Sequence, residues 1–242
     1  MPYILRQKPG GETAVYVWFS GMHTRIDMFF ESENHTAGQF LEIADRIKAL
    51  INRIEMAGNC FDAGSELYNI NRLAPGVRAD LSECLFDMLS QCLAYNVSTG
   101  GLFDVTVGSE KHDAGTIKKL HITPDRQFYR DDELVAVNLS GFIKGYALDR
   151  IKTIIETERI YHALVNMGNS SIMAIGCKIP ATDIENSVLT TSGNDSSERI
   201  HIMNPLTGEY IRGKRRVEVV TAGGAEGEVK ATCKFITDNC LL

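Results

Sequence analysis

The order of the hydrophobic patterns is the feature that most limits the fold of this chain, because strand patterns and helix patterns fall in separate blocks. Apolar and polar residues alternate over Ala14–Phe19 and Arg25–Phe30, which predicts a β-hairpin with its turn at Ser20-Gly21. Apolar residues then recur every three to four positions from Phe40 to Ile54, which predicts an amphipathic helix that ends at Gly58. The chain is therefore expected to open with a β-hairpin that is followed by a helix.

A second helix is predicted after a polar loop, Asn59–Asn71. It opens at Asp80, with Glu83 three residues later as in a capping box, and it stops before Gly100-Gly101. The segment Ser109–Asp132 is polar and rich in turn-forming residues, and we assign no helix or strand to it. The strand expected next, Leu134–Leu139, leads into a helix over residues 143–158.

The last third of the chain returns to strand patterns. The candidate strands are Ala163–Met167, Ser171–Ile175, Arg199–Met203, Tyr210–Arg212 and Val217–Thr221, and a short helix over Val229–Ile236 follows them. Helices and strands are segregated, which favours an α+β fold with an antiparallel or mixed sheet over a doubly wound parallel sheet. We find no internal repeat, linker or low-complexity block, so a single compact domain over residues 1–242 is expected.

Composition narrows the classes of partner. The chain has 242 residues, of which 25 are basic and 31 acidic, and this leaves a net charge of −6. An acidic balance argues against bulk attraction to nucleic acid, so no nucleic-acid partner is expected. No apolar stretch approaches the roughly 20 residues that span a bilayer, and no transmembrane segment is expected.

The cysteines and the N-terminal segment bear on the compartment. The six cysteines show neither a CxxC pair nor a metal-ligand spacing, so we interpret them as buried thiols of a reduced protein. The first residues show no charged region followed by an apolar run. The chain as given is expected to be soluble, cytoplasmic if it is complete and periplasmic or exported if a leader was removed.

The segment Leu139–Asp149, LSGFIKGYALD, is the strongest candidate for ligand binding. A strand that turns into a helix presents free backbone N–H groups, and these together with the helix dipole suit a phosphate. Lys144 would add a positive charge in the first turn, where the dipole disfavours a cation, and Gly145 permits close backbone approach. The alternative is a loop with a solvated lysine, since the segment is no Walker motif.

Three further stretches are candidates for functional sites. Thr99–Gly108 combines two glycines with a Phe-Asp pair, although a C-cap and turn would explain it. His201–Gly208 contains Asn-Pro and Gly, which is also an ordinary turn between strands. Glu228 and Thr232 lie four residues apart, on one helix face, and their oxygens suit Mg²⁺. The alternative for this pair is a surface glutamate beside a threonine bonded to its own helix.

Taken together and in order, these stretches resemble the ApbE family, the FAD:protein FMN transferases. The family pattern runs from DSELxxxN through GGxFDxTVG, LGAIAKGYAVD, LVxxGG, TSG and H-I-x-D-P-x-T-G to an ADALATA-type helix. The matching stretches here are GSELYNIN (residues 64–71), GGLFDVTVG (100–108), LSGFIKGYALD (139–149), LVNMGNS (164–170), TSGN (191–194), HIMNPLTG (201–208) and EVKATCKF (228–235). The resemblance covers about residues 22–236, nearly the whole chain.

The resemblance implies a reaction and a set of site residues. Such enzymes bind FAD as substrate and, with Mg²⁺, transfer its FMN half to a Thr or Ser hydroxyl of an acceptor protein and release AMP. By position, Lys144 and His201 become the catalytic residues. The FAD-binding residues become Phe103, Asp104, Leu139, Ser140, Lys144, Asp149, Gly168, Ser192, Gly193 and His201. The metal ligands become the Gly141 carbonyl and the side chains of Glu228 and Thr232.

The chain also departs from the family pattern. Glu228 stands where the family has Asp, so its carboxylate reaches one methylene further and must fold back to keep octahedral geometry. Asn204 replaces the Asp of the H-I-x-D-P element, Asn169 replaces a second Gly, and the segment between Gly108 and Leu139 is short for the family. Two alternatives therefore stand beside the transferase: an FAD pyrophosphatase that gives FMN and AMP, and a non-catalytic FAD-binding or interaction protein.

Overall fold

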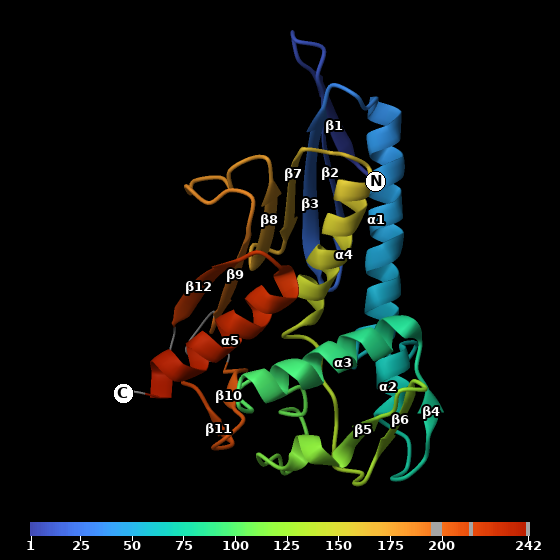
Figure 1. The fold of residues 1–242 in the computed structure, drawn as a ribbon, viewed down its shortest axis with the longest axis vertical. Coiled ribbons are helices and arrows are strands. Elements are labelled where there is room, and N and C mark those ends of the chain that lie inside the picture. Colours follow the sequence, from blue (N-terminus) through green and yellow to red (C-terminus); the bar gives the residue numbers. More distant parts are fainter. Residues whose placement is uncertain (195–199, 213–214, 241–242) are drawn as a thin grey trace. The chain divides into compact units, whose positions relative to one another are not determined.

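The structure is a computed structural model that describes residues 1–194, 200–212 and 215–240 (Figure 1). Its strands are β1 (Tyr3–Gln7), β2 (Thr13–Gly21), β3 (Thr24–Ser32), β4 (Ala79–Asp80), β5 (Leu120–Ile122), β6 (Gln127–Arg130), β7 (His162–Met167), β8 (Ser171–Ile175), β9 (Val188–Gly193), β10 (Met203–Asn204), β11 (Glu209–Tyr210) and β12 (Arg216–Thr221). Its helices are α1 (Ala37–Gly58), α2 (Glu66–Ile70), α3 (Glu83–Ser98), the short 3₁₀ helix η1 (Thr116–Lys119), α4 (Ile143–Thr157) and α5 (Gly224–Cys240).

The chain divides into two compact units, each made of three separate segments. The first unit consists of Met1–Asn52, Lys144–Thr191 and Glu218–Glu228. The second consists of Arg53–Ile143, Ser192–Val217 and Val229–Leu242. Because the segments interleave along the sequence, neither unit can be cut from the chain as one continuous piece. A single domain over residues 1–242 stays a prediction.

The first unit is built on a seven-stranded sheet in the order β1-β2-β3-β7-β8-β9-β12. The pairings from β1 to β9 are antiparallel. Alternate residues of β2 and β3, such as Val15, Val17 and Met28, are fully buried, as the alternating pattern predicts. Helix α1 covers this face, and the ring of Phe40 stacks on Phe30 with centroids 5.8 Å apart. Antiparallel strands packed against separate helices confirm the predicted α+β class.

The predicted opening hairpin is present, but its turn was placed two residues early. Gly21 pairs with Thr24, so the two-residue loop is Met22-His23, with φ angles of 51° and 56°. Two consecutive positive φ angles are those of a type I′ turn, whose twist matches the flanking strands. Met and His are not among the residues that usually form such a turn, whereas Ser and Gly are common in turns. The turn was therefore predicted at Ser20-Gly21. Strands β1 and β9 of the same sheet were also missed.

The second unit holds a three-stranded sheet in the order β4-β6-β5 together with α2 and α3. The predicted start of α3 at Asp80 is wrong, because Asp80 pairs with Gln127 in the β4–β6 ladder. Ser82 caps α3 instead, and its hydroxyl accepts a hydrogen bond from the Leu85 N–H at 3.2 Å. No helix or strand was assigned to the polar segments 59–71 and 109–132, yet the first contains α2 and the second contains η1, β5 and β6.

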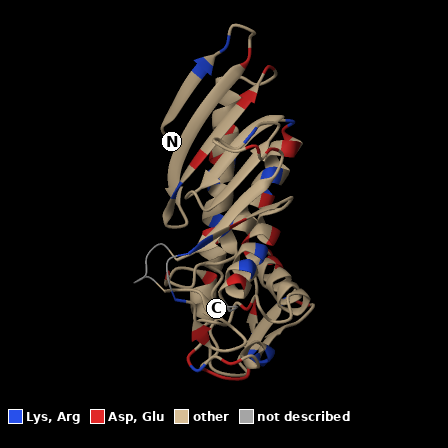
Figure 2. Cartoon of the chain, turned by 90° about the vertical axis from the view of Figure 1, so that its left-hand side faces the viewer, with Lys and Arg blue, Asp and Glu red and all other residues tan. Residues whose placement is uncertain are grey.

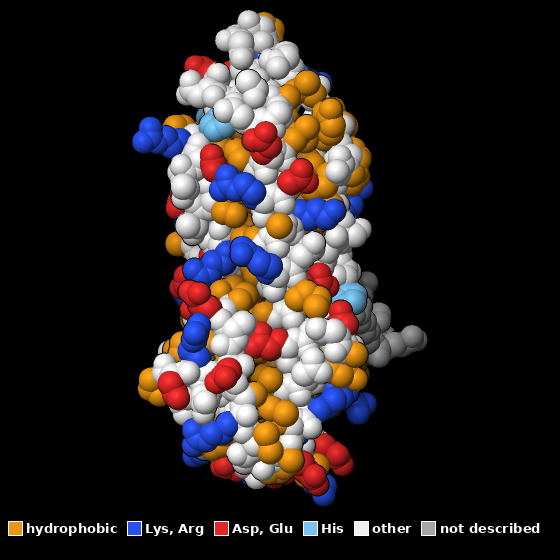
Figure 3. All heavy atoms as spheres, turned by 90° about the vertical axis from the view of Figure 1, so that its right-hand side faces the viewer, with side chains coloured by type: hydrophobic (Ala, Val, Ile, Leu, Met, Phe, Trp, Pro, Cys, Tyr) orange, Lys and Arg blue, Asp and Glu red, His pale blue; other side chains and the backbone are white. Residues whose placement is uncertain are grey.

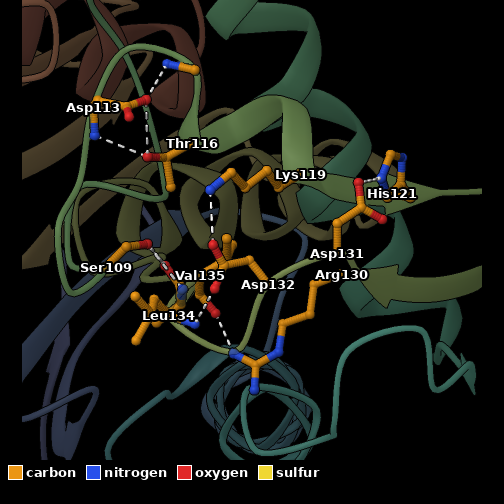
Figure 4. A network of polar contacts seen from close by, with 12 residues as sticks. Ser109, Asp113, Thr116, Lys119, His121, Arg130, Asp131, Asp132, Leu134 and Val135 are labelled. Carbon is orange, nitrogen blue, oxygen red and sulfur yellow. Dashed lines mark hydrogen bonds and ion pairs between the residues drawn. The ribbon is translucent and has the colours of Figure 1, made fainter.

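The predicted strand Leu134–Leu139 is not a strand. Its backbone groups bond to side chains and a loop carbonyl rather than to a ladder. The Asn71 amide bonds both the N–H and the carbonyl of Val137, at 2.9 and 2.8 Å. Ser109 accepts from the Ala136 N–H, and the Arg130 guanidinium donates to the Val135 carbonyl (Figure 4). The apolar run is buried as a strand would be, which explains the misassignment.

The C-terminal predictions are partly confirmed. The candidate strands near 203 and 210 shrink to β10 and β11, which pair around the predicted Asn-Pro turn, and Arg199 lies outside the described residues. Helix α5 is longer at both ends than the predicted Val229–Ile236. The predicted strands Ala163–Met167, Ser171–Ile175 and Val217–Thr221 and the helix beginning at Ile143 are confirmed to within one residue at each end.

Charged residues of both signs are interspersed along the elements in Figure 2, and they are mixed on the face drawn in Figure 3. This mixing accords with the small net charge of the chain. None of the described helices combines the length and the apolar character that crossing a bilayer requires.

Candidate active site

Lys144 lies in the first turn of α4, as predicted. That turn contains no acidic residue. The Lys144 ammonium donates a hydrogen bond to the hydroxyl of Ser170, which lies in the loop between β7 and β8. The cation is thus held at the N-terminal end of a helix, where the dipole disfavours it. Such a placement favours an anion as the partner of Lys144.

Glu228 lies in α5, and the fold of the first unit places it near Lys144. Its side chain is buried, with 7% of the residue exposed, and Oε1 accepts a hydrogen bond from the Ser171 hydroxyl at 2.6 Å. Burial raises the pKa of the Glu228 carboxyl to about 7, while the positive charge of Lys144 and the Ser171 hydrogen bond oppose that rise. The structure therefore brings near each other two charged residues that are far apart in the sequence.

Helices α4 and α5 cross where each has a glycine. A Cβ atom on Gly145 would lie 2.2 Å from the carbonyl oxygen of Gly224 and 2.6 Å from Cγ of Glu228. A Cβ on Gly224 would lie 2.3 Å from the Gly145 carbonyl oxygen. The close approach predicted for Gly145 is therefore made by the α5 backbone, and it lets the stem of Glu228 pass over α4.

Asp149 fixes the start of α5. Its Oδ1 accepts a hydrogen bond from the Gly224 N–H at 2.6 Å, and its Oδ2 accepts one from the Ala225 N–H at 2.9 Å. A carboxylate at this position satisfies unpaired N–H groups of the helix and complements its dipole. Asp149 was predicted to contact the nucleotide. In this structure its two oxygens bind the helix that carries Glu228, and the nucleotide contact stays a prediction.

Replacing Asp149 by Ala is expected to lower the free energy of unfolding by about 2 kcal/mol, because two hydrogen bonds to a charged group are lost. Amide hydrogen exchange should quicken at Gly224 and Ala225, and urea unfolding measures the stability change. Thr153→Ala in the same helix is the control, because it removes a hydroxyl that donates to the backbone carbonyl of Asp149 and not to the start of α5. If Asp149→Ala weakened FAD binding without changing stability or exchange, Asp149 would serve the nucleotide alone.

The remaining predicted residue of the first unit is Gly168, in the β7–β8 loop. Its φ is +67°, and a Cβ there would lie 2.2 Å from the Thr24 hydroxyl oxygen. The glycine is therefore required by the packing of two hairpin turns. Its predicted contact with FAD stays a prediction.

The other predicted site residues belong to the second unit. Phe103 is buried against Tyr95 and Phe142, with ring centroids 6.5 and 6.1 Å away. Asp104 accepts hydrogen bonds from the N–H and hydroxyl of Thr106, both at 2.6 Å. Leu139 is buried, Ser140, Gly141 and His201 are exposed, and Ser192, Gly193 and Thr232 are half-buried. Their predicted roles in binding FAD or metal stay predictions.

The donors proposed for Mg²⁺ suit a hard cation, because all three are oxygens and one is a carboxylate. The buried Glu228 carboxyl, whose pKa is raised by desolvation, is a group that a cation would stabilise in its charged form. Among the described residues no three His, Cys, Asp or Glu side chains gather as a metal cluster. The proposed set contains one carboxylate only, with a hydroxyl and a backbone carbonyl completing it.

Ser170 and Ser171 are site residues that the sequence did not reveal. They contact Lys144 and Glu228, respectively, and Ser171 is fully buried. One signal was available, because a glutamate that replaces an aspartate needs something to hold its longer side chain. Nothing in the sequence says which of the hydroxyl residues supplies that contact.

The fold and sequence match flavin transferases. The structure is similar to the flavinyl transferase ApbE of Pseudomonas stutzeri, with a TM-score of 0.79 and 14% identity over 93% of this chain and 84% of that one. It is also similar to the flavin transferase ApbE of Vibrio cholerae, with a TM-score of 0.75 and 17% identity over 93% and 87%. A FAD:protein FMN transferase of Klebsiella pneumoniae (strain 342) is 24% identical over 80% of this chain and 75% of its own length.

The model of the ApbE family matches residues 22–239, nearly the whole chain. The chain therefore belongs to the ApbE family. The resemblance that the ordered motifs suggested is confirmed.

Proposed function

We propose that this protein is a Mg²⁺-dependent FAD:protein FMN transferase, which moves FMN from FAD to a Thr or Ser hydroxyl of an acceptor protein and releases AMP. The class of enzyme, a flavin transferase, follows from membership of the ApbE family and from the name of the curated relative. The metal, the acceptor hydroxyl and the released nucleotide are our proposal.

The observation that carries the proposal is the pairing of Lys144 with the buried Glu228. A buried carboxylate is costly unless a positive charge accompanies it. Here one lysine faces it from the start of a helix, and the two side chains are held by neighbouring serines. An ammonium and a carboxylate that influence each other electrostatically, and that are each held by a serine hydroxyl, can bind a phosphate and a divalent cation together.

In the proposed reaction the hydroxyl oxygen of the acceptor attacks the phosphorus of the FMN half of FAD. A new P–O bond forms, the bond from that phosphorus to the bridging oxygen breaks, and AMP leaves with the electron pair. Lys144 would stabilise the negative charge that develops on the phosphate oxygens. His201 would accept the proton of the attacking hydroxyl, a task suited to histidine near neutral pH.

In the first unit, the Glu228 side chain would be the ligand of Mg²⁺. The family resemblance alone adds the Thr232 side chain and the Gly141 carbonyl as further ligands. When bound, the ion supplies Lewis-acid stabilisation of the phosphate oxygens. The task of Glu228 is to remain ionised in a buried place. The metal charge would favour that state and lower the pKa of its carboxyl.

The test is to incubate the protein with FAD, Mg²⁺ and a candidate acceptor domain that carries an exposed Thr or Ser. We expect AMP release and a matching mass gain of FMN on the acceptor. Release of AMP with no labelled acceptor, repeated over several acceptor domains, would indicate the pyrophosphatase. Binding of FAD without AMP release would indicate a binding protein, and either result would overturn the transferase.

Replacing Lys144 by Ala is expected to lower the rate of AMP release at least about 100-fold, because one charge on the transferring phosphate is lost. Arg150→Ala is the matched control, since Arg150 is an exposed cation of the same helix that stacks on Tyr146 with 4.9 Å to the ring centroid. Its rate should stay within about twofold. Equal losses in the two variants would remove Lys144 from the reacting phosphate.

A further inference from the structure

We propose that Ser171 is a positioning residue for the metal ligand Glu228. Ser171 holds the carboxylate of the glutamate in place, and an aspartate, whose side chain is shorter, would not need this contact. The inference rests on the proposed function, because it concerns the same metal. It assigns a task to a residue that neither the motif pattern nor the order of the sequence singles out.

The first step is the contact itself. The Ser171 hydroxyl donates to Oε1 of Glu228 at 2.6 Å, the length of a strong hydrogen bond to a charged acceptor. An ionised carboxylate has about four lone-pair sites, and the serine uses one of them. The other sites remain for a metal ion.

The second step is the rigidity of the donor. Ser171 is fully buried and is the first residue of β8. Its backbone pairs with Met167 of β7 on one side and with Thr190 of β9 on the other. Because Ser171 lies on an interior strand of the sheet, its hydroxyl has little freedom to move. It can therefore restrict the position of the carboxylate that it binds.

The third step is the confinement of the Glu228 stem on the opposite side. A Cβ atom on Gly145 would lie 2.6 Å from Cγ of Glu228, so the α4 backbone lies against this part of the side chain. The start of α5 is held by Asp149. Glutamate has one more rotatable bond than aspartate, and a hydrogen bond at its end offsets the loss of that freedom. Ser171 supplies this bond.

The experiment measures metal affinity rather than turnover. Mn²⁺, an octahedral substitute for Mg²⁺, is titrated into the metal-free protein, and free Mn²⁺ is counted by electron paramagnetic resonance. We expect Ser171→Ala to weaken Mn²⁺ binding about 10-fold, the loss seen when an outer partner of a metal ligand is removed. Thr13→Val is the matched control, because it removes a buried hydroxyl of the same unit that bonds Gln7. Its affinity should not change.

A double-mutant cycle separates positioning from a general effect on folding. In the Glu228→Asp background the shorter side chain withdraws from Ser171, so adding Ser171→Ala should change the Mn²⁺ affinity less than about twofold. An unchanged affinity in Ser171→Ala alone would overturn the proposal, and so would an equal loss in both backgrounds. If the unaltered protein binds no Mn²⁺, the metal-dependent function itself fails. If it binds Mn²⁺ and the cycle shows no coupling, only the role of Ser171 fails.

Discussion

Gly145→Ala is expected to lower the free energy of unfolding by about 3 kcal/mol or more, and the variant is expected to lose the crossing of α4 and α5. The added Cβ would lie 2.2 Å from the Gly224 carbonyl oxygen, which is backbone and cannot rotate away. Asp149 also holds the start of α5 in place, so the helix cannot move aside without breaking two hydrogen bonds. Urea unfolding followed by circular dichroism measures the loss.

Gly141→Ala is the matched control, four residues earlier in the same segment. Nothing lies within 4 Å of a Cβ there, and its φ is not in the left-handed region. We expect this variant to be neutral or more stable by about 0.4–1 kcal/mol, because alanine restricts the unfolded chain. Equal stability of the two variants would show that the glycine crossing does not exist in solution.

Glu228→Gln is expected to abolish Mg²⁺-dependent turnover and to change how stability depends on pH. The pKa of the Glu228 carboxyl is about 7 in the folded protein, against an ordinary value of 4.5. A raised pKa means that the folded state binds the proton more tightly than the unfolded state does. The contribution is therefore fully present below pH 4.5 and is lost as the pH rises through 7, a change of about 3 kcal/mol.

Glutamine cannot ionise, so metal-free Glu228→Gln should match the unaltered protein near pH 4.5 and exceed its stability at pH 8. Thermal unfolding in the presence of a chelator at both pH values measures the difference. Mg²⁺ should then stabilise the unaltered protein at pH 8 and leave the variant unchanged. A stability difference that is the same at both pH values would contradict burial of an ionisable Glu228, and unchanged turnover would remove it from the metal site.

Much of the fold could be predicted from local patterns. The period of the apolar residues identified α1 and α4, and the alternation in β2 and β3 identified the hairpin, because both patterns report which face is buried. The errors occurred where a partner distant in sequence decides the structure. Leu134–Leu139 reads as a strand, yet its hydrogen bonds go to the Asn71 and Ser109 side chains and the Val105 carbonyl. The periodicity of apolar residues cannot distinguish such a buried segment from a strand that is paired in a sheet.

The candidate site could be predicted in part. Lys144 and Glu228 were singled out by residue type and by their places in ordered motifs, and the structure brings them together. The task of Asp149 could not be predicted, because the N–H groups that it binds are 75 and 76 residues away in the chain. Ser170 and Ser171 were missed for the same reason.

By itself the sequence determined the family, the class of fold and the residue types of the site, because motif order and hydrophobic period are properties of the chain alone. Only the tertiary structure decided what each of these residues contacts. Gly145 faces the Gly224 backbone, and Asp149 caps the helix that carries Glu228. Ser171 holds the Glu228 carboxylate. These contacts join segments that are adjacent only after folding, since burial and hydrogen bonding depend on distance in space and not on separation in sequence.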